Sequence, residues 1–213
     1  MDTIYNFETI TSQIKKYNRE NITLIVVSKN STPDDIIPIL DKGHIHFGEN
    51  KVQEAKDKWP YLKKSYPNAN LHFVGKLQSN KVRDVVKIFD YVHSLESEKL
   101  ARLLDDEENK TSKKLKYLIQ VNLASETMKS GVSASMLDSL IHYCKNQTSL
   151  NVIGLMCLPP LLQDCNFYFK QLKELSIKCN LTELSMGMSN DYDCAINNGA
   201  TFIRVGSKIF TKG

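Results

Sequence analysis

Short apolar runs recur along the chain, and a segment long enough for a helix separates each run from the next. The runs are rich in β-branched residues, as in TLIVVS at 23–28. Nearly continuous apolar runs of this length are typical of strands that are buried on both faces of a parallel sheet. We therefore predict eight strands, at residues 23–28, 44–48, 71–75, 91–95, 116–123, 152–157, 183–187 and 202–206.

The segments between these runs carry helix signals. In residues 32–43, Thr32 is a candidate N-cap, Pro33 stands at the first helical position and Gly43 follows the end. Pro38 inside the same segment predicts an early break or a kink, because proline removes a backbone donor. Further helices are predicted at 4–17, 96–109, 133–146, 163–179 and 189–199, the last with Ser189 as its N-cap.

Eight strands that alternate with helices match a (β/α)8 TIM barrel, which 213 residues are just long enough to build. An open doubly wound sheet is the alternative that the pattern leaves open. Because the segment after the last strand is too short for a full outer helix, the N-terminal helix is expected to cover that gap. We predict one α/β domain over residues 1–213.

Composition and charge narrow the class of protein. Hydrophobic residues make up 41% and charged residues 24%, which is ordinary globular usage. No apolar run approaches the roughly 18 residues of a membrane span, and the N-terminus lacks the pattern of a signal peptide, so a cytoplasmic protein without a membrane partner is expected. The net charge of +4 is spread along the chain, which argues against nucleic acid as a partner.

Metal and disulfide sites find no support in the sequence. The five cysteines are an odd number and include no CxxC pair, so neither a disulfide framework nor a zinc site is predicted. His44, His46, His72 and His93 lie in predicted strands without a carboxylate at metal-ligand spacing, and we expect them to pack in the core or at the rim.

Lys29 directly follows the first predicted strand. In a barrel of this kind the site lies at the carboxyl ends of the strands. A lysine amine in a partly dehydrated rim can lose its proton and condense with an aldehyde to form a Schiff base. A solvated lysine at the end of a strand is the alternative interpretation.

The ends of the last two predicted strands suit an anion. Ser189, Gly206 and Ser207 lie where such barrels often bind phosphate. Ordinary capping and turn roles are the alternative. Arg204 interrupts an apolar strand, and a buried guanidinium needs a partner. That partner is either a structural carboxylate or a ligand atom such as a ring nitrogen or a phosphate oxygen.

Six stretches carry a family resemblance, in order along the chain: VVSKN at 26–30, FGENKVQE at 47–54, HFVGKLQSNK at 72–81, QVNLASETMKSGV at 120–132, GLMCLPP at 154–160 and LSMGMSNDYDCAINNGATFIRVGSKIF at 184–210. Together they resemble the pyridoxal phosphate homeostasis protein family. The resemblance implies the barrel of the alanine racemase N-terminal domain, fold type III among proteins that bind pyridoxal 5′-phosphate (PLP).

The resemblance also implies PLP as the cofactor and a role for individual residues. It makes Lys29 the Schiff-base lysine, and Arg204 the partner of the pyridine nitrogen. The remaining implied positions are Ser189, Gly206 and Ser207 at the phosphate, Asn50 and Met186 along the cofactor, and Lys81 and Lys129 in the family's lysine-bearing motifs.

An arginine at the pyridine nitrogen bears on the chemistry. A guanidinium stays protonated and donates to that nitrogen, which discourages protonation of the ring and weakens it as an electron sink. We also expect no second domain of the kind that completes the alanine racemase site. The sequence therefore predicts a monomeric PLP-binding protein of vitamin B6 homeostasis without catalytic residues, and apo PLP enzymes are possible partners. A minor PLP-dependent amino acid racemase or lyase is the alternative, and a sugar-phosphate barrel enzyme without PLP is a third.

Overall fold

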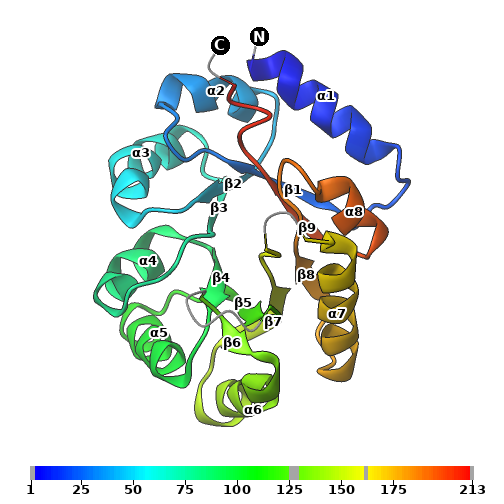
Figure 1. Ribbon diagram of the computed structural model, residues 1–213. Coiled ribbons are helices and arrows are strands. Elements are labelled where there is room, and N and C mark those ends of the chain that lie inside the picture. Colours follow the sequence, from blue (N-terminus) through cyan, green and yellow to red (C-terminus); the bar gives the residue numbers. More distant parts are fainter. Residues whose placement is uncertain (1–2, 125–129, 161–162, 212–213) are drawn as a thin grey trace.

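Eight parallel strands close into a barrel within the residues that the structure, a computed structural model, describes: 3–124, 130–160 and 163–211 (Figure 1). They are β1 (Thr23–Val27), β2 (His46–Glu49), β3 (Asn70–Phe73), β4 (Tyr91–Leu95), β5 (Lys116–Asn122), β7 (Asn151–Met156), β8 (Glu183–Ser185) and β9 (Phe202–Val205). Their order around the ring is β4-β3-β2-β1-β9-β8-β7-β5, and pairing of β4 with β5 closes it. The predicted barrel is confirmed, and each strand lies within two residues of its predicted ends.

Helices surround the ring of strands (Figure 1). They are α1 (Thr3–Lys15), α2 (Pro33–Asp41), α3 (Val52–Ser65), α4 (Val82–Ile88), α5 (Glu98–Thr111), α6 (Leu137–Gln147), α7 (Cys165–Lys178) and α8 (Tyr192–Asn197). A short strand that the sequence did not predict, β6 (Val132–Ser133), pairs with the end of β5 outside the ring. No described helix is both long and apolar enough to cross a membrane.

The segment around α1 occupies the gap beside the last strand, as predicted. The hydroxyl of Tyr17 donates to Oδ1 of Asp193 at 2.8 Å, and Nη1 of Arg19 donates to the carbonyl oxygen of Ile196 at 2.6 Å. Both bonds tie the chain after α1 to α8. The N-terminal helix thus takes the place that an eighth outer helix after β9 would hold.

Helix α2 corrects the prediction made from Pro38. The helix starts as expected, with Thr32 and Asp35 forming a capping box, but it continues past Pro38 to Asp41. Proline removes only one intrahelical donor, and the apolar face of α2 stays buried against the barrel. The predicted early break is therefore wrong.

Helix α8 corrects the role of Ser189. The helix begins at Tyr192 and its N-cap is Asp191, so Ser189 does not cap it. Oδ1 of Asp191 accepts from the N–H of Met188 at 2.6 Å, and this bond turns the chain before the helix starts. Ser189 lies inside that turn and is buried.

The interior of the barrel combines apolar and polar side chains. Successive residues of a strand face opposite sides, so alternate residues point inward. One apolar cluster contains only strand residues and fills the interior: Ile25, Tyr91, Leu118, Met156 and Phe202. The larger cluster packs the outer face of the strands against the helices. Buried polar side chains accompany the inner cluster: His72, His93, Ser185 and Arg204.

Buried histidines predict that acid destabilises the protein. Burial lowers the pKa of His44 from 6.5 to about 4, and lowers the pKa values of His72 and His93 well below the usual range. The unfolded chain takes up these protons near its ordinary pKa, whereas the folded chain resists them. The free energy of unfolding is therefore highest above pH 6.5 and falls as the pH drops toward 4. His44 alone accounts for about 3 kcal/mol of this loss once the pH reaches 4, at roughly 1.36 kcal/mol per pKa unit.

Urea unfolding curves recorded from neutral pH down to about pH 5 measure this loss. A free energy of unfolding that stays constant over that interval would contradict the prediction. His142 is exposed on α6, so the variant His142→Gln should keep the pH dependence of the natural sequence.

Candidate functional site

The predicted site residues gather on one arc of the barrel rim. The strands β2, β1, β9 and β8 are consecutive neighbours in the ring, and their carboxyl ends point the same way because all pairings are parallel. The predicted residues stand at or just beyond these ends: Asn50 after β2, Lys29 after β1, Arg204, Gly206 and Ser207 at β9, and Met186 and Ser189 after β8.

Lys29 lies in the turn that follows β1 and is exposed. Its amine forms no hydrogen bond or ion pair with any residue in the described ranges. The next residue, Asn30, has a φ of 60°, and its N–H donates to Oε2 of Glu54 at 3.0 Å. The backbone of the turn is thus fixed while the amine of Lys29 is left available.

A buried ion pair anchors the turn that carries Lys29. Nζ of Lys58 lies 2.7 Å from Oε1 of Glu49, and the Glu49 side chain is fully buried. The same ammonium donates to the carbonyl oxygens of Ser28 at 2.9 Å and Ser31 at 3.2 Å. The hydroxyl of Ser28 also donates to Oε1 of Glu49 at 2.7 Å. One cluster therefore holds both ends of residues 28–31.

This ion pair was not predicted from the sequence. The available signal was a glutamate in the last position of a buried strand, followed by a lysine on the apolar face of the next helix. Neither residue type stands out in a charged stretch such as ENKVQEAKDKW, because most charged residues there lie on the surface.

Arg204 lies inside the barrel, level with Ile25 of β1. Nη1 donates to Oγ of Ser185 at 2.5 Å, and Nη2 donates to the carbonyl oxygen of Cys157 at 3.1 Å. Burial lowers its pKa, and no carboxylate in the described ranges forms a salt bridge with it. The structural ion pair that the sequence left open is therefore absent among these residues, and the remaining guanidinium donors are available to a ligand.

Gly206 brings the end of β9 against the end of β1. A Cβ atom at this position would lie 2.7 Å from the carbonyl oxygen of Val27, so only glycine fits. Ser207 is exposed and Ser189 is buried, and neither hydroxyl has a hydrogen-bond partner in the described part of the chain. Two free hydroxyls therefore stand at the ends of the neighbouring strands β8 and β9.

Asn50 and Met186 differ in what they present. Oδ1 of Asn50 is buried and has no hydrogen-bond partner among the described residues, so it is open to a donor from a ligand or from water. The Met186 side chain packs in the outer core cluster, which leaves only its backbone toward the rim.

Lys81 ends the short 3-10 helix Ser79–Lys81, and Lys129 lies outside the described residues.

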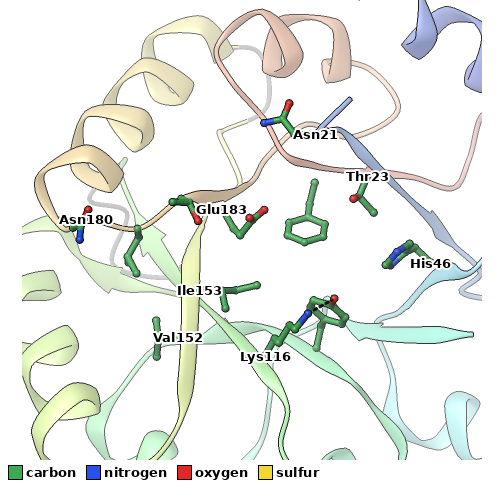
Figure 2. A pocket seen from close by; sticks show the side chains of 12 residues that line it. Asn21, Thr23, His46, Lys116, Val152, Ile153, Asn180 and Glu183 are labelled. Carbon is green, nitrogen blue, oxygen red and sulfur yellow. Dashed lines mark hydrogen bonds between the residues drawn. The ribbon is translucent and has the colours of Figure 1, made fainter. Parts of the chain in front are cut away.

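A cavity of about 550 Å³ opens at the opposite mouth of the barrel (Figure 2). Its walls come from the first residues of several strands, including His46, Tyr91, Lys116, Glu183 and Phe202. None of the predicted cofactor residues lines it. The cavity is thus a feature separate from the rim that carries Lys29.

Comparisons with known proteins agree on one relationship. The family model described as alanine racemase, N-terminal domain, matches residues 5–212. The pyridoxal phosphate homeostasis protein of Vibrio cholerae is 37% identical and aligns with 96% of this chain and 94% of its own. The structure of PipY from Synechococcus elongatus without PLP is 34% identical, with a TM-score of 0.91 over 99% of this chain and 100% of that one. The structure of PipY with PLP bound is also 34% identical, with a TM-score of 0.88 over 98% and 99%.

Proposed function

This chain belongs to the pyridoxal phosphate homeostasis protein family, whose barrel is that of the alanine racemase N-terminal domain, and from that premise we propose that it binds PLP and takes part in vitamin B6 homeostasis. The relatives give the class of ligand through their names and, for PipY, through a structure with PLP bound. The residues of this chain suggest where and how PLP is held.

The observation that carries the proposal is the buried guanidinium of Arg204. It has hydrogen bonds to Ser185 and Cys157, and no described carboxylate forms a salt bridge with it, although the charge of Asp191 acts on it from a distance. A buried cation in this state favours a ligand that offers an acceptor and negative charge. The pyridine nitrogen of PLP is such an acceptor, and its phosphate supplies the charge. The amide oxygen of Asn50, just beyond the end of β2, has no partner among the described residues and also fits a bound ligand.

The proposed arrangement assigns one task to each part of the rim. Lys29 would hold the cofactor covalently, because a lysine amine can condense with an aldehyde with loss of the carbonyl oxygen as water. Ser189, Gly206 and Ser207 would hold the phosphate, because two hydroxyls and a close backbone approach are available there. Asn50 and the backbone at Met186 line the ring.

Arg204 sets the chemical character of this site. When bound, PLP supplies a reactive aldehyde and a ring that withdraws electrons best when its nitrogen is protonated. A guanidinium donates a hydrogen bond to that nitrogen and offers it no acid proton, because the arginine pKa stays far above neutral. The site therefore favours holding and releasing PLP over transamination. Apo PLP enzymes as recipients and a monomeric state in solution belong to the same proposal.

The second candidate function is a minor PLP-dependent amino acid racemase or lyase. The barrel of the alanine racemase N-terminal domain favours it. Both functions use the same Lys29 and differ in turnover at the α-carbon of an amino acid.

Mapping of the reduced complex tests the binding proposal. The protein is mixed with PLP, its visible spectrum is recorded, and borohydride then fixes the link before peptide mapping. We expect a single modified peptide that contains Lys29. Modification confined to another lysine would overturn the assignment.

Incubation with alanine and serine in deuterated water separates the two functions. Repeated exchange of the α-proton, at about one per second, would favour the enzyme, since that is the low end of ordinary turnover. A retained chromophore without exchange would favour the carrier.

A further inference from the structure

A line of hydrogen-bonded side chains crosses the barrel from Arg204 to the cavity at the opposite mouth. Oγ of Ser185, already bonded to Arg204, lies 2.8 Å from Nδ1 of His93. Nε2 of His93 lies 2.9 Å from Nδ1 of His72, and Nε2 of His72 lies 3.0 Å from Nδ1 of His46. His46 lines the cavity (Figure 2). The line thus connects the rim with the far mouth through the centre of the barrel.

The packing fixes the two central rings, His72 and His93, and favours their uncharged form. His72 and His93 are completely buried, and burial lowers both pKa values well below the usual range. His72 stacks on Tyr91 with ring centroids 4.1 Å apart, and Phe202 packs against both histidines. A neutral imidazole has one nitrogen that donates and one that accepts. Each neutral ring therefore carries its hydrogen either on Nδ1 or on Nε2.

The hydrogen bond from Arg204 to Ser185 determines which tautomer each ring adopts. A guanidinium can only donate, so Oγ of Ser185 must accept from it. The one described acceptor for the hydroxyl hydrogen of Ser185 is Nδ1 of His93. His93 then carries its hydrogen on Nε2 and donates to Nδ1 of His72. The same step repeats from His72 to His46, so every hydrogen bond points away from Arg204.

We propose that Ser185, His93, His72 and His46 form a directed hydrogen-bond chain that positions the guanidinium of Arg204, with all three histidines as Nε2–H tautomers. Ser185 sets the direction, and His46 ends the chain by presenting its Nε2–H on the side of the cavity. These four are positioning residues, since they reach the rim only through Arg204. The hydrogen-bond chain consists of side chains of the protein itself, and its relevance to PLP rests on the proposed function.

Nitrogen NMR of the protein without PLP tests the chain directly. The 15N shifts and long-range couplings of each imidazole distinguish a bare Nδ1 from a bare Nε2. At neutral pH we expect a bare Nδ1 and a protonated Nε2 for all three histidines. A hydrogen on Nδ1 of any one of them would overturn the proposal. This measurement needs no variant and no bound cofactor.

Two substitutions test the direction. Ser185→Ala removes the group that fixes the direction, so all three histidines should change to mixed tautomers together. His72→Phe keeps an aromatic ring between Tyr91 and Phe202 but cuts the chain. His93 should then stay an Nε2–H tautomer, because Ser185 still donates to it, whereas His46 loses its donor and becomes mixed. A purely structural role would disturb both neighbours of His72 alike.

Two controls accompany these variants. Ser185→Thr keeps the hydroxyl and should retain the tautomers of the natural sequence. Ser94 is the next residue on β4, is buried, and its hydroxyl has no described partner, so Ser94→Ala should change nothing. Unchanged tautomers in Ser185→Ala would overturn the proposal. Its failure would leave the borohydride mapping at Lys29 untouched, so the chain and PLP binding are tested separately.

Discussion

Replacement of Lys29 by alanine is expected to abolish the covalent attachment of PLP while leaving the stability of the protein almost unchanged. The amine is the only part of this side chain that the proposed link uses, and no described residue bonds to it. An exposed side chain without partners contributes within about 0.5 kcal/mol to the free energy of unfolding. Visible absorbance after mixing with PLP measures the first effect, and thermal unfolding measures the second.

Lys51 provides the matched control for this prediction. It is an exposed lysine beside the same rim, immediately after Asn50, and its only described ion pair is with Glu54 on the surface. Lys51→Ala should keep the chromophore. If Lys29→Ala kept the chromophore as well, or if it unfolded the protein, the placement of Lys29 at an open rim would be wrong.

Glu49→Gln is expected to reduce the free energy of unfolding by about 3–5 kcal/mol, the usual loss when one member of a buried ion pair is removed. The substitution leaves the ammonium of Lys58, whose side chain is 10% exposed, without its counter-charge. It also changes the acceptor that Ser28 and the indole N–H of Trp59 share. Because this cluster holds the turn at 28–31, which carries Lys29, the affinity for PLP should fall too.

Two further variants identify the cause of this loss. The double variant Glu49→Gln with Lys58→Met removes both charges and should recover part of the stability. Lys178→Met breaks a pair of nearly equal length, 2.7 Å to Asp138, with both side chains more than half exposed, and should cost less than about 1 kcal/mol. Urea unfolding measures all four proteins. Equal losses of unfolding free energy in Glu49→Gln and in Lys178→Met would contradict the role given to Glu49.

Much of the fold could be predicted because periodicity and strand length are local properties. The run at 23–28 and its seven counterparts read as buried strands without any knowledge of their neighbours. The rim followed from topology, since parallel strands in a barrel bring Lys29, Asn50, Ser189 and Gly206 to one end. The N-terminal helix could be placed from the shortness of the last segment alone.

What could not be predicted depends on partners far apart in the sequence. Arg204 and Ser185 lie on adjacent strands, but the bonds of Ser185 to His93 and of Arg204 to Cys157 join strands that no local pattern connects. The histidines were expected to pack in the core or at the rim, yet their nitrogen-to-nitrogen order required the geometry of the barrel. Ser189 was misjudged as a cap because an Asp191 turn replaced the first turn of the expected helix.

The hydrogen-bond chain of Ser185 and the three histidines also constrains which substitutions this barrel can accept over evolutionary time. The interior of such barrels is commonly filled by layers of branched aliphatic side chains that can be exchanged one at a time. Here an aliphatic residue in place of one histidine would leave its neighbours in the hydrogen-bond chain with a buried donor or acceptor that has no partner. Related sequences should therefore keep or lose the residues at positions 46, 72, 93 and 185 as a set, and aligned sequences that vary them independently would point to a different interior.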